Sequence, residues 1–258
     1  MSDILITECE DGVAVVTFNR PQARNAMTFE MYERLAAFCR AAGEKPGLRV
    51  ILLRGEGGKA FASGTDIAQF RSIRTPEDAL AYEARISATL RALEDCPVPT
   101  IAAIRGACTG GGAAIAACCD LRIAASDLKF GFPIARTLGN TLSLENYARL
   151  SALIGQARVK DLLFTARLAG AEEVAAWGLV SAVAAPEDLD EAARALARQI
   201  AAHAPLTLKA AKRALALLRA PVPEEEARAI NLSCYLSEDF REGVEAFLAR
   251  RPPRWKGR

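Results

Sequence analysis

The sequence has 258 residues, of which 51% are hydrophobic and 25% are charged, and this balance excludes a disordered chain. A formal net charge of +2 argues against a protein that binds nucleic acid over its whole surface. The single histidine nearly excludes a zinc site built on imidazole, and the seven cysteines include no C-x-x-C pair, so we expect no metal site.

Cysteine spacing and the N-terminal segment indicate the compartment. An odd number of irregularly spaced cysteines is typical of reduced thiols. The segment MSDILITECEDG carries acids where a secretory signal has a basic region, and no apolar run approaches the roughly 20 residues that span a bilayer. We therefore expect a cytoplasmic protein without a membrane partner.

Hydrophobic patterning predicts alternating strands and helices in the first half of the chain. Polarity alternates on both sides of Asp11-Gly12, which predicts a hairpin over Ile4–Thr17. The further elements, in chain order, are a helix over Met27–Ala42, a strand over Arg49–Arg54, a loop over Lys59–Ile67, a helix from Pro76 to Glu94, a strand over Thr100–Ile104, a helix from Gly111, and strands over Asp120–Ala125 and Leu128–Phe130.

The second half of the chain is mostly helical in pattern. This pattern starts at Leu142, and one strand at Leu179–Val183 interrupts it. The whole order predicts an α/β fold, with a core over residues 1–195 and a helical C-terminal region over residues 196–258.

Histidine and cysteine catalysis find no support. His203 follows a predicted helix, where a cationic side chain complements the helix dipole, so we expect a structural role. A Ser-His-Asp or Cys-His centre would have to use this residue. Cys118 and Cys119 lie on an apolar helix face and are expected to be buried core thiols.

Two glycine-centred turns are more informative. Ser63–Asp66 follows one predicted strand, and Gly110–Gly112 opens a helix after another. Glycine lets the backbone approach a ligand closely, and a helix N-terminus presents unpaired N–H groups. Two such turns that face each other would supply two donors to one developing oxyanion. Taken singly, each turn could equally serve packing alone.

Four segments, taken together, resemble the crotonase superfamily, the enoyl-CoA hydratase/isomerase enzymes. The segments are VTFNRPQARNAM (Val16–Met27), KAFASGTDI (Lys59–Ile67), IRGACTGGGAAIAACCDLRIA (Ile104–Ala124) and SEDFREGVEAFLARRPPRWKGR (Ser237–Arg258). The resemblance covers essentially the whole chain, in order. It implies a spiral of ββα units with a helical C-terminal trimerisation region, and a homotrimer or a hexamer made of two trimers.

The resemblance also implies a substrate and its site. The substrate would be an acyl-CoA thioester, with coenzyme A as part of the substrate and no permanently bound cofactor. Its carbonyl oxygen would lie between the backbone N–H groups of Thr65 and Gly111. The residues to which the resemblance assigns contact with coenzyme A or the acyl group are Arg24, Ala26, Ser63, Gly64, Asp66, Ile67, Ala68, Gly110, Phe240 and Lys256.

The sequence departs from the family where hydratases carry their two catalytic glutamates. One position is Ala114 and the other, after Gly131-Phe132-Pro133, is Ile134, and neither side chain transfers protons. Glu145 is the carboxylate nearest in sequence to the second position. It is either a displaced acid/base or a first-turn glutamate that complements a helix dipole.

Several functions remain open at this point. An acyl-CoA enzyme could isomerise a double bond, add water in an atypical way, decarboxylate its substrate or hydrolyse the thioester. A catalytically silent acyl-CoA-binding protein would keep the pocket and lose the chemistry. RNA binding through a basic helix is discounted, because Met31–Ala42 carries only Arg34 and Arg40.

Overall fold

The computed structural model describes residues 3–8, 11–217, 225, 228, 232 and 235–254, and two sheets form its centre. Within these residues, the larger sheet has the strand order β1 (Ile4–Glu8), β2 (Val13–Phe18), β3 (Val50–Gly55), β5 (Thr100–Ile104), β7 (Leu121–Ala125), β10 (Ala182–Ala184). The smaller sheet has the order β4 (Ala60–Ala62), β6 (Ala107–Thr109), β8 (Lys129–Gly131), β9 (Ala169–Gly170).

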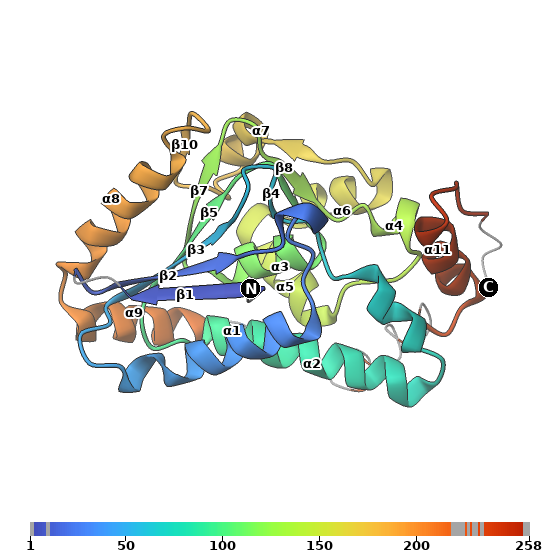
Figure 1. Ribbon diagram of the computed structural model, residues 1–258, viewed down its shortest axis with the longest axis horizontal. Helices are drawn as coiled ribbons and strands as arrows, with labels where there is room; N and C mark the ends of the chain where they lie inside the picture. The colour runs from blue at the N-terminus through green and yellow to red at the C-terminus, as the bar shows by residue number, and fades with distance from the viewer. Residues whose placement is uncertain are drawn as a thin grey trace.

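From β3 to β8, consecutive strands alternate between the two sheets, and a helix follows each pair. After β3 and β4 comes α2 (Pro76–Glu94), after β5 and β6 comes α3 (Gly111–Cys118), and β7 and β8 precede α4 (Ile134–Thr137). The strands from β2 to β10 in the larger sheet run parallel. This arrangement confirms the predicted α/β spiral of ββα units (Figure 1).

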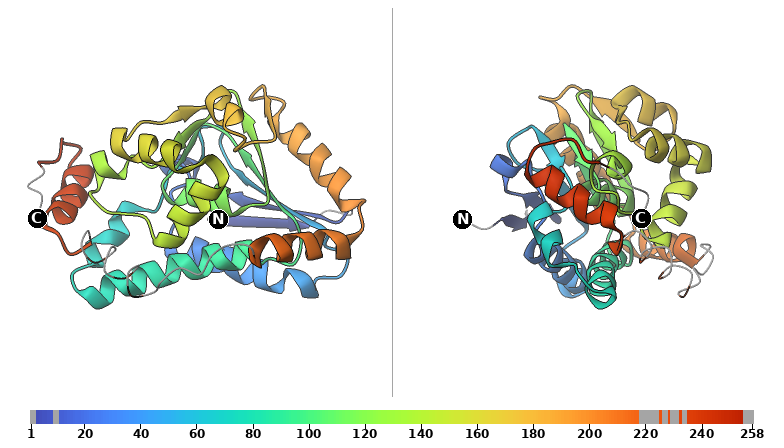
Figure 2. Two further views of the ribbon diagram at one scale, coloured as in Figure 1. Left: turned by 180° about the vertical axis from the view of Figure 1, so that it is seen from behind. Right: turned by 90° about the vertical axis from the view of Figure 1, so that its right-hand side faces the viewer.

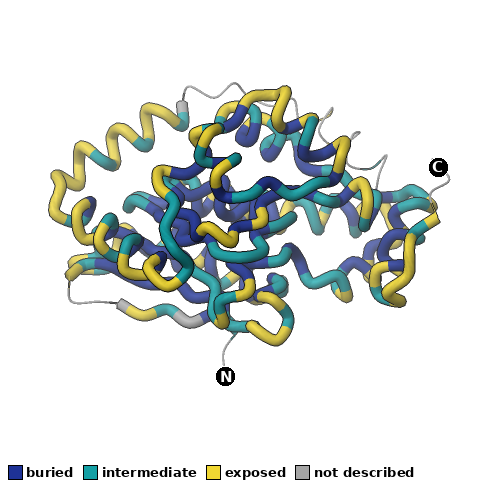
Figure 3. Tube along the Cα trace, turned by 90° about the horizontal axis from the view of Figure 1, so that it is seen from above, coloured by how far each residue is buried: buried dark blue, intermediate teal, exposed yellow. Residues whose placement is uncertain are grey.

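Both faces of the larger sheet are covered. One face packs against α8 (Leu189–Ala201), whose buried stripe includes Ala193 and Ala197. The other face packs into the main core, to which α1 (Phe29–Ala41), α2 and α3 contribute. Strands buried on both faces read as continuous apolar runs, which is why β3 and β5 were recognisable. Figure 3 shows the buried backbone concentrated at the centre of the molecule.

The second half of the chain supplies the outer helices. They are α5 (Leu144–Ile154), α6 (Gln156–Thr165), α7 (Ala171–Ala176), α9 (Pro205–Leu217) and α11 (Glu238–Leu248). Helix α11 lies at the end of the molecule opposite α8 and contacts the 3-10 helix η3 (Ile67–Ser72) (Figures 1 and 2). No described helix is long and apolar enough to cross a membrane.

Four strands depart from the sequence prediction: three were not expected, and one is shifted along the chain. The segment expected as a loop, Lys59–Ile67, contains β4, and neither β6 nor β9 was expected. The strand expected at Leu179–Val183 forms instead at Ala182–Ala184. The unexpected strands have two or three residues each, which is too short for a period-two pattern to be visible. The predicted boundary at residue 195 lies inside α8, so the division into two regions stays a prediction.

Candidate active site

The two glycine turns lie against each other. They follow β4 and β6, which are adjacent and parallel, so both turns leave the same edge of the smaller sheet. The Thr109 hydroxyl donates to the Ser63 carbonyl over 3.0 Å. A side chain at Gly110 would place its Cβ 3.6 Å from Gly64 Cα. Gly64 and Gly110 have φ of +115° and +52°, a region that favours glycine.

The turns present two backbone donors. The Met27 N–H donates to the Gly64 carbonyl over 2.8 Å, and the Asp66 N–H donates to the Met27 carbonyl over 2.9 Å. These bonds flank Thr65, whose own N–H has no hydrogen-bond partner among the described residues. The N–H of Gly111, the first residue of α3, likewise has none there, as expected at a helix N-terminus. Both residues line one cavity of about 710 Å³.

Buried hydroxyl groups hold the Thr65 side chain. The Tyr32 hydroxyl lies 2.9 Å from Thr65 Oγ1, and the Tyr82 hydroxyl lies 3.4 Å from the same atom. Burial raises the pKa of Tyr32 to about 12, so its hydroxyl stays protonated near neutral pH. A Cβ at Gly111 would lie 2.1 Å from the Tyr32 hydroxyl, so only glycine fits beside it.

The positions of the two missing glutamates also face this cavity. Ala114 lines it from α3. Ile134 lines it from α4, just beyond β8, whose parallel pairing with β6 brings that segment to the same edge. The structure therefore places both residues at the cavity wall and leaves that wall apolar.

Glu83 is a cavity residue that the sequence analysis missed. It lies on α2, lines the cavity and accepts a hydrogen bond of 2.6 Å from the Tyr235 hydroxyl. Burial raises the pKa of Glu83 from 4.5 to about 7, while the Tyr235 hydrogen bond lowers it and the nearby Glu145 charge raises it. A glutamate in register with the buried positions Ala79 and Ile86 was the available signal.

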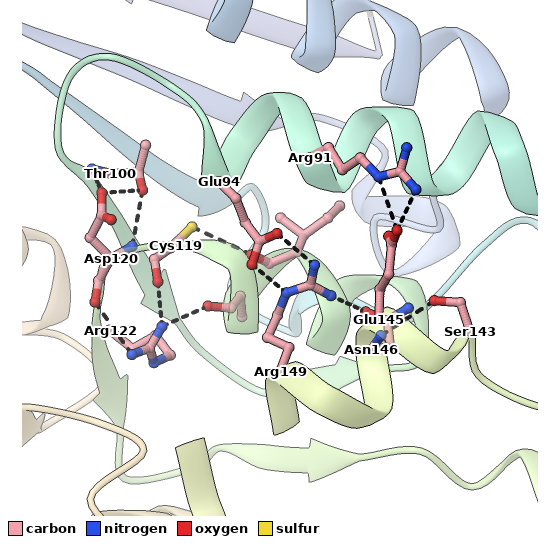
Figure 4. Close-up of polar contacts among 12 residues, drawn as sticks. Arg91, Glu94, Thr100, Cys119, Asp120, Arg122, Ser143, Glu145, Asn146 and Arg149 are labelled. Atoms are coloured by element: carbon pink, nitrogen blue, oxygen red, sulfur yellow. Dashed lines mark hydrogen bonds and ion pairs between the residues drawn. The ribbon is translucent and has the colours of Figure 1, made fainter. Parts of the chain in front are cut away.

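Glu145, the predicted acid/base candidate, lies elsewhere. It occupies the first turn of α5, where its carboxylate accepts hydrogen bonds from the Arg91 guanidinium, including one of 3.0 Å from Nε. It is not among the residues that line the cavity. Figure 4 shows the Glu145 carboxylate turned toward Arg91. The structure gives this residue an ion pair and a place near the helix N-terminus, and does not bring it to the turns.

A buried ion pair supports the opposite wall through Asn146. Arg149 is 4% exposed and makes two hydrogen bonds to the Glu94 carboxylate, of 2.6 and 2.7 Å. Its third contact is to Asn146 Oδ1 (Figure 4). Asn146 lines the cavity. The guanidinium therefore engages the oxygen of a side chain that belongs to the cavity lining, and fixes its orientation.

The predicted coenzyme A residues divide into three groups. Those that line the cavity are Arg24, Ala26, Ser63, Gly64, Asp66, Ile67, Ala68 and Gly110. Arg24 has φ of +50° and an exposed side chain, and the adjacent Asn25 holds this turn with amide bonds of 3.0 and 2.8 Å to the Glu56 and Ala60 carbonyls. Asp66 also caps η3 and forms an ion pair with Arg20.

Two predicted residues do not join this group. Phe240 is 1% exposed and packs edge-on against Phe70 and Tyr235, outside the cavity lining. Its contact with coenzyme A stays a prediction without direct support from its placement. Lys256 lies outside the described residues. The described residues contain no cluster of potential metal ligands.

Comparisons with known proteins agree on one family. The family model described as "Enoyl-CoA hydratase/isomerase" matches residues 8–258. A crotonyl-CoA hydratase of Syntrophomonas wolfei is 34% identical over 96% of this chain and 95% of its own length. An (E)-benzylidenesuccinyl-CoA hydratase of Thauera aromatica is 36% identical over 97% and 98%. The solved structure of a methylmalonyl-CoA decarboxylase in complex with 2-nitronate-propionyl-CoA matches with a TM-score of 0.89 and 29% identity, over 100% and 99% of the two chains.

Proposed function

Because the chain belongs to the enoyl-CoA hydratase/isomerase family, we propose that it binds an acyl-CoA thioester and stabilises its enolate. The thioester oxygen would accept hydrogen bonds from the N–H groups of Thr65 and Gly111. The observation that carries this proposal is the contact between the two glycine turns, which leaves both donors facing one cavity. One such donor is worth about 2.7–4 kcal/mol in the transition state in other enzymes. Coenzyme A enters as part of the substrate, and no permanently bound cofactor is invoked.

The exposed end of the cavity suits the coenzyme A portion. Arg24 lies there with a side chain that makes no ion pair to any described residue, and it would meet a phosphate. Ala26 and Ala68 line the path between this end and the turns. The acyl group would extend past the turns toward Ala114 and Ile134.

Double-bond isomerisation is the reaction that these walls favour. Hydration of an enoyl thioester uses an acid and a base around one water, and the two family positions for them carry Ala114 and Ile134. A shift of the double bond from the β,γ to the α,β position needs only one group that takes and returns a proton. The proposed substrate is therefore a β,γ-unsaturated acyl-CoA.

Decarboxylation is a second candidate. Loss of CO₂ from an α-carboxylated acyl-CoA leaves its electron pair in the enolate, so the oxyanion donors suffice and no base is required. The TM-score of 0.89 to a methylmalonyl-CoA decarboxylase is the observation that favours it. Release of CO₂ from an α-carboxyacyl-CoA, with no isomerisation of a 3-enoyl-CoA, would select this reaction.

An assembly of three subunits, or of two such trimers, is also proposed. Large apolar side chains lie exposed on the outer helices: Phe164 on α6 is 79% exposed and Leu206 on α9 is 78% exposed. Such side chains are typical of subunit contacts when they gather on one surface. Sedimentation equilibrium tests this, and a monomer at micromolar concentration would contradict it.

The direct test follows exchange of the α protons of butyryl-CoA with D₂O, which reports the enolate when the site also supplies a base; CO₂ release from an α-carboxyacyl-CoA reports it when the site does not. Proline is tolerated at the first position of a helix and removes the N–H there. We therefore compare Tyr32→Phe, which clears space beside residue 111, with the double variant Tyr32→Phe/Gly111→Pro.

The double variant should exchange about 10²–10³ times more slowly than Tyr32→Phe, with butyryl-CoA binding retained. Equal rates in the two variants would contradict the role of the Gly111 donor. Binding by the unmodified protein without any exchange, and without CO₂ release from an α-carboxyacyl-CoA, would instead favour a silent acyl-CoA-binding protein.

A further inference from the structure

One carboxylate that lines the cavity keeps an oxygen without a hydrogen bond to any described residue. The acidic residues among the described ones that line the cavity are Asp66 and Glu83. Asp66 accepts a hydrogen bond from the Ala68 N–H and pairs with Arg20, so both its oxygens are engaged. Glu83 has one engaged oxygen, Oε1, and its Oε2 makes no hydrogen bond to any described residue.

Helix α2 brings Glu83 next to the oxyanion turn. Its neighbour Tyr82 lies within hydrogen-bonding reach of Thr65 Oγ1, at 3.4 Å. Ile86, one turn further along α2, lines the same cavity. Residues three apart on a helix share a face, so Glu83 and Ile86 present their side chains to the same wall. The carboxyl group therefore reaches the acyl part of the cavity from α2, whereas Ala114 reaches it from α3.

Hydrogen bonds orient the Glu83 carboxyl group. The Asn140 amide donates to the Tyr235 hydroxyl over 3.3 Å, and that hydroxyl donates to Glu83 Oε1 over 2.6 Å. An O–H···O⁻ bond of this length is of the charge-assisted kind. Since Oε1 is held in this way, Oε2 is the oxygen left to meet a substrate carbon.

We infer that Glu83 is the acid/base of this site and that Tyr235 is its positioning residue. The inference rests on the proposed function, because it places the proton transfer on the enolate held by Thr65 and Gly111. It assigns to α2 a role that the family pattern gives to the positions of Ala114 and Ile134.

A single carboxyl group can carry out the whole isomerisation of a β,γ-enoyl thioester. Glu83 Oε2 takes the α proton, the C–H bond breaks, and its electron pair enters a dienolate whose negative oxygen faces the N–H groups of Thr65 and Gly111. The same carboxyl group then returns the proton to the γ carbon, where a C–H bond forms. The double bond has moved into conjugation, Glu83 is a carboxylate again, and no water or oxidant is consumed.

The surroundings of Glu83 suit transfer in both directions. A group whose pKa is close to the working pH both accepts and donates a proton efficiently, and burial places the pKa of Glu83 at about 7. The titratable groups that face it are the tyrosines Tyr32, Tyr82 and Tyr235, which burial keeps protonated. Glu145 acts from α5 through its charge, which Arg91 compensates.

The test compares Glu83→Gln with Glu145→Gln, a matched loss of one carboxylate outside the cavity. The readouts are α-proton exchange of butyryl-CoA in D₂O, conversion of a 3-enoyl-CoA to its conjugated isomer, and butyryl-CoA affinity by calorimetry. Glu83→Gln should lower exchange and isomerisation by 10²–10⁴-fold with affinity within about threefold. Glu145→Gln should stay within about threefold of the unmodified protein in all three.

Tyr235→Phe separates positioning from folding. The Tyr235 hydrogen bond lowers the pKa of Glu83, so its loss should move the acidic limb of the isomerisation rate, which is set by Glu83 as a base, to higher pH as well as lowering kcat. A merely structural tyrosine would leave that limb in place.

The outcomes separate the two proposals. Exchange in Glu83→Gln within threefold of the unmodified protein would overturn the assignment of Glu83 while the enolate chemistry stands. No exchange in the unmodified protein, despite bound butyryl-CoA, would overturn the assignment of Glu83; if no CO₂ is released from an α-carboxyacyl-CoA either, the enolate proposal is overturned as well.

Discussion

Replacing Glu83 with glutamine should change how the stability of the protein depends on pH. Burial raises the pKa of this carboxyl from 4.5 to about 7 in the folded state. Between these values the folded protein keeps a proton that the unfolded chain has released. The stabilisation that results is fully present below the unfolded pKa and is lost as the pH rises through the folded pKa.

The size of the effect follows from the two pKa values. A tenfold change in proton affinity is worth about 1.36 kcal/mol, so the shift from 4.5 to about 7 corresponds to about 3 kcal/mol. About 2.5 kcal/mol of this falls between pH 5 and pH 8. Glutamine has nearly the same shape and no titration, so the contribution disappears in Glu83→Gln.

Urea unfolding at fixed protein concentration measures this pH-dependent contribution of Glu83, because linear extrapolation gives the free energy of unfolding at each pH. The stability of the unmodified protein minus that of Glu83→Gln should fall by about 2.5 kcal/mol from pH 5 to pH 8. Other titrating groups cancel in this difference. Glu77→Gln, which removes an exposed carboxylate from the first turn of the same helix, is the control. A difference that stays constant between the two pH values would refute the burial argument for Glu83.

Three further predictions test the remaining parts of the site. Arg149→Met removes the buried guanidinium that makes two hydrogen bonds to the largely buried Glu94 carboxylate, and should lower the free energy of unfolding in urea by about 3 kcal/mol. Arg24→Gln should raise KM several-fold for acyl-CoA, because the coenzyme A portion carries the phosphates that Arg24 would bind. For the same acyl group on a short pantetheine-like thiol, which has no such phosphates, KM should stay unchanged. Equal effects on both substrates would exclude a phosphate contact. Ala114→Glu combined with Ile134→Glu places two carboxylates at the cavity wall, and the variant should hydrate crotonyl-CoA faster than the unmodified protein, followed by loss of enoyl absorbance; equal rates would contradict the role given to these positions.

The larger sheet and its helices were predictable because their patterns are local. The hairpin around Asp11-Gly12, the apolar run of β3 and the capped start of α2 are each readable within a few residues. Strands β4, β6 and β9 are not, because two or three residues pair only where a neighbouring strand is already in place. Their existence depends on tertiary contacts that a linear sequence does not display.

The candidate site shows the same limit at the level of single side chains. Glu145 was a candidate acid/base because it is close in sequence to Ile134, and its carboxylate binds Arg91 outside the cavity, at the first turn of α5. Glu83 lies 51 positions before Ile134 in the chain, yet it lines the same cavity because α2 packs against α3. Sequence distance to a lost residue is a poor guide when helices from different ββα units form the same wall.

The role proposed for Tyr235 joins the C-terminal region to the chemistry. This tyrosine is 2% exposed and packs against Tyr82 and Phe240, with ring centroids 5.6 and 5.0 Å apart. Its hydroxyl reaches Glu83 from the C-terminal region, to which the sequence analysis assigned assembly and coenzyme A contact but no part in proton transfer. If Glu83 transfers the proton, the orientation of that carboxyl depends on how the segment from Tyr235 to α11 seats against η3 and α2. The oxyanion donors belong to the ββα spiral, whereas the C-terminal region would set the orientation of the Glu83 carboxyl group. A change in how the C-terminal region packs should therefore lower the rate of proton transfer more than it lowers the affinity for the thioester.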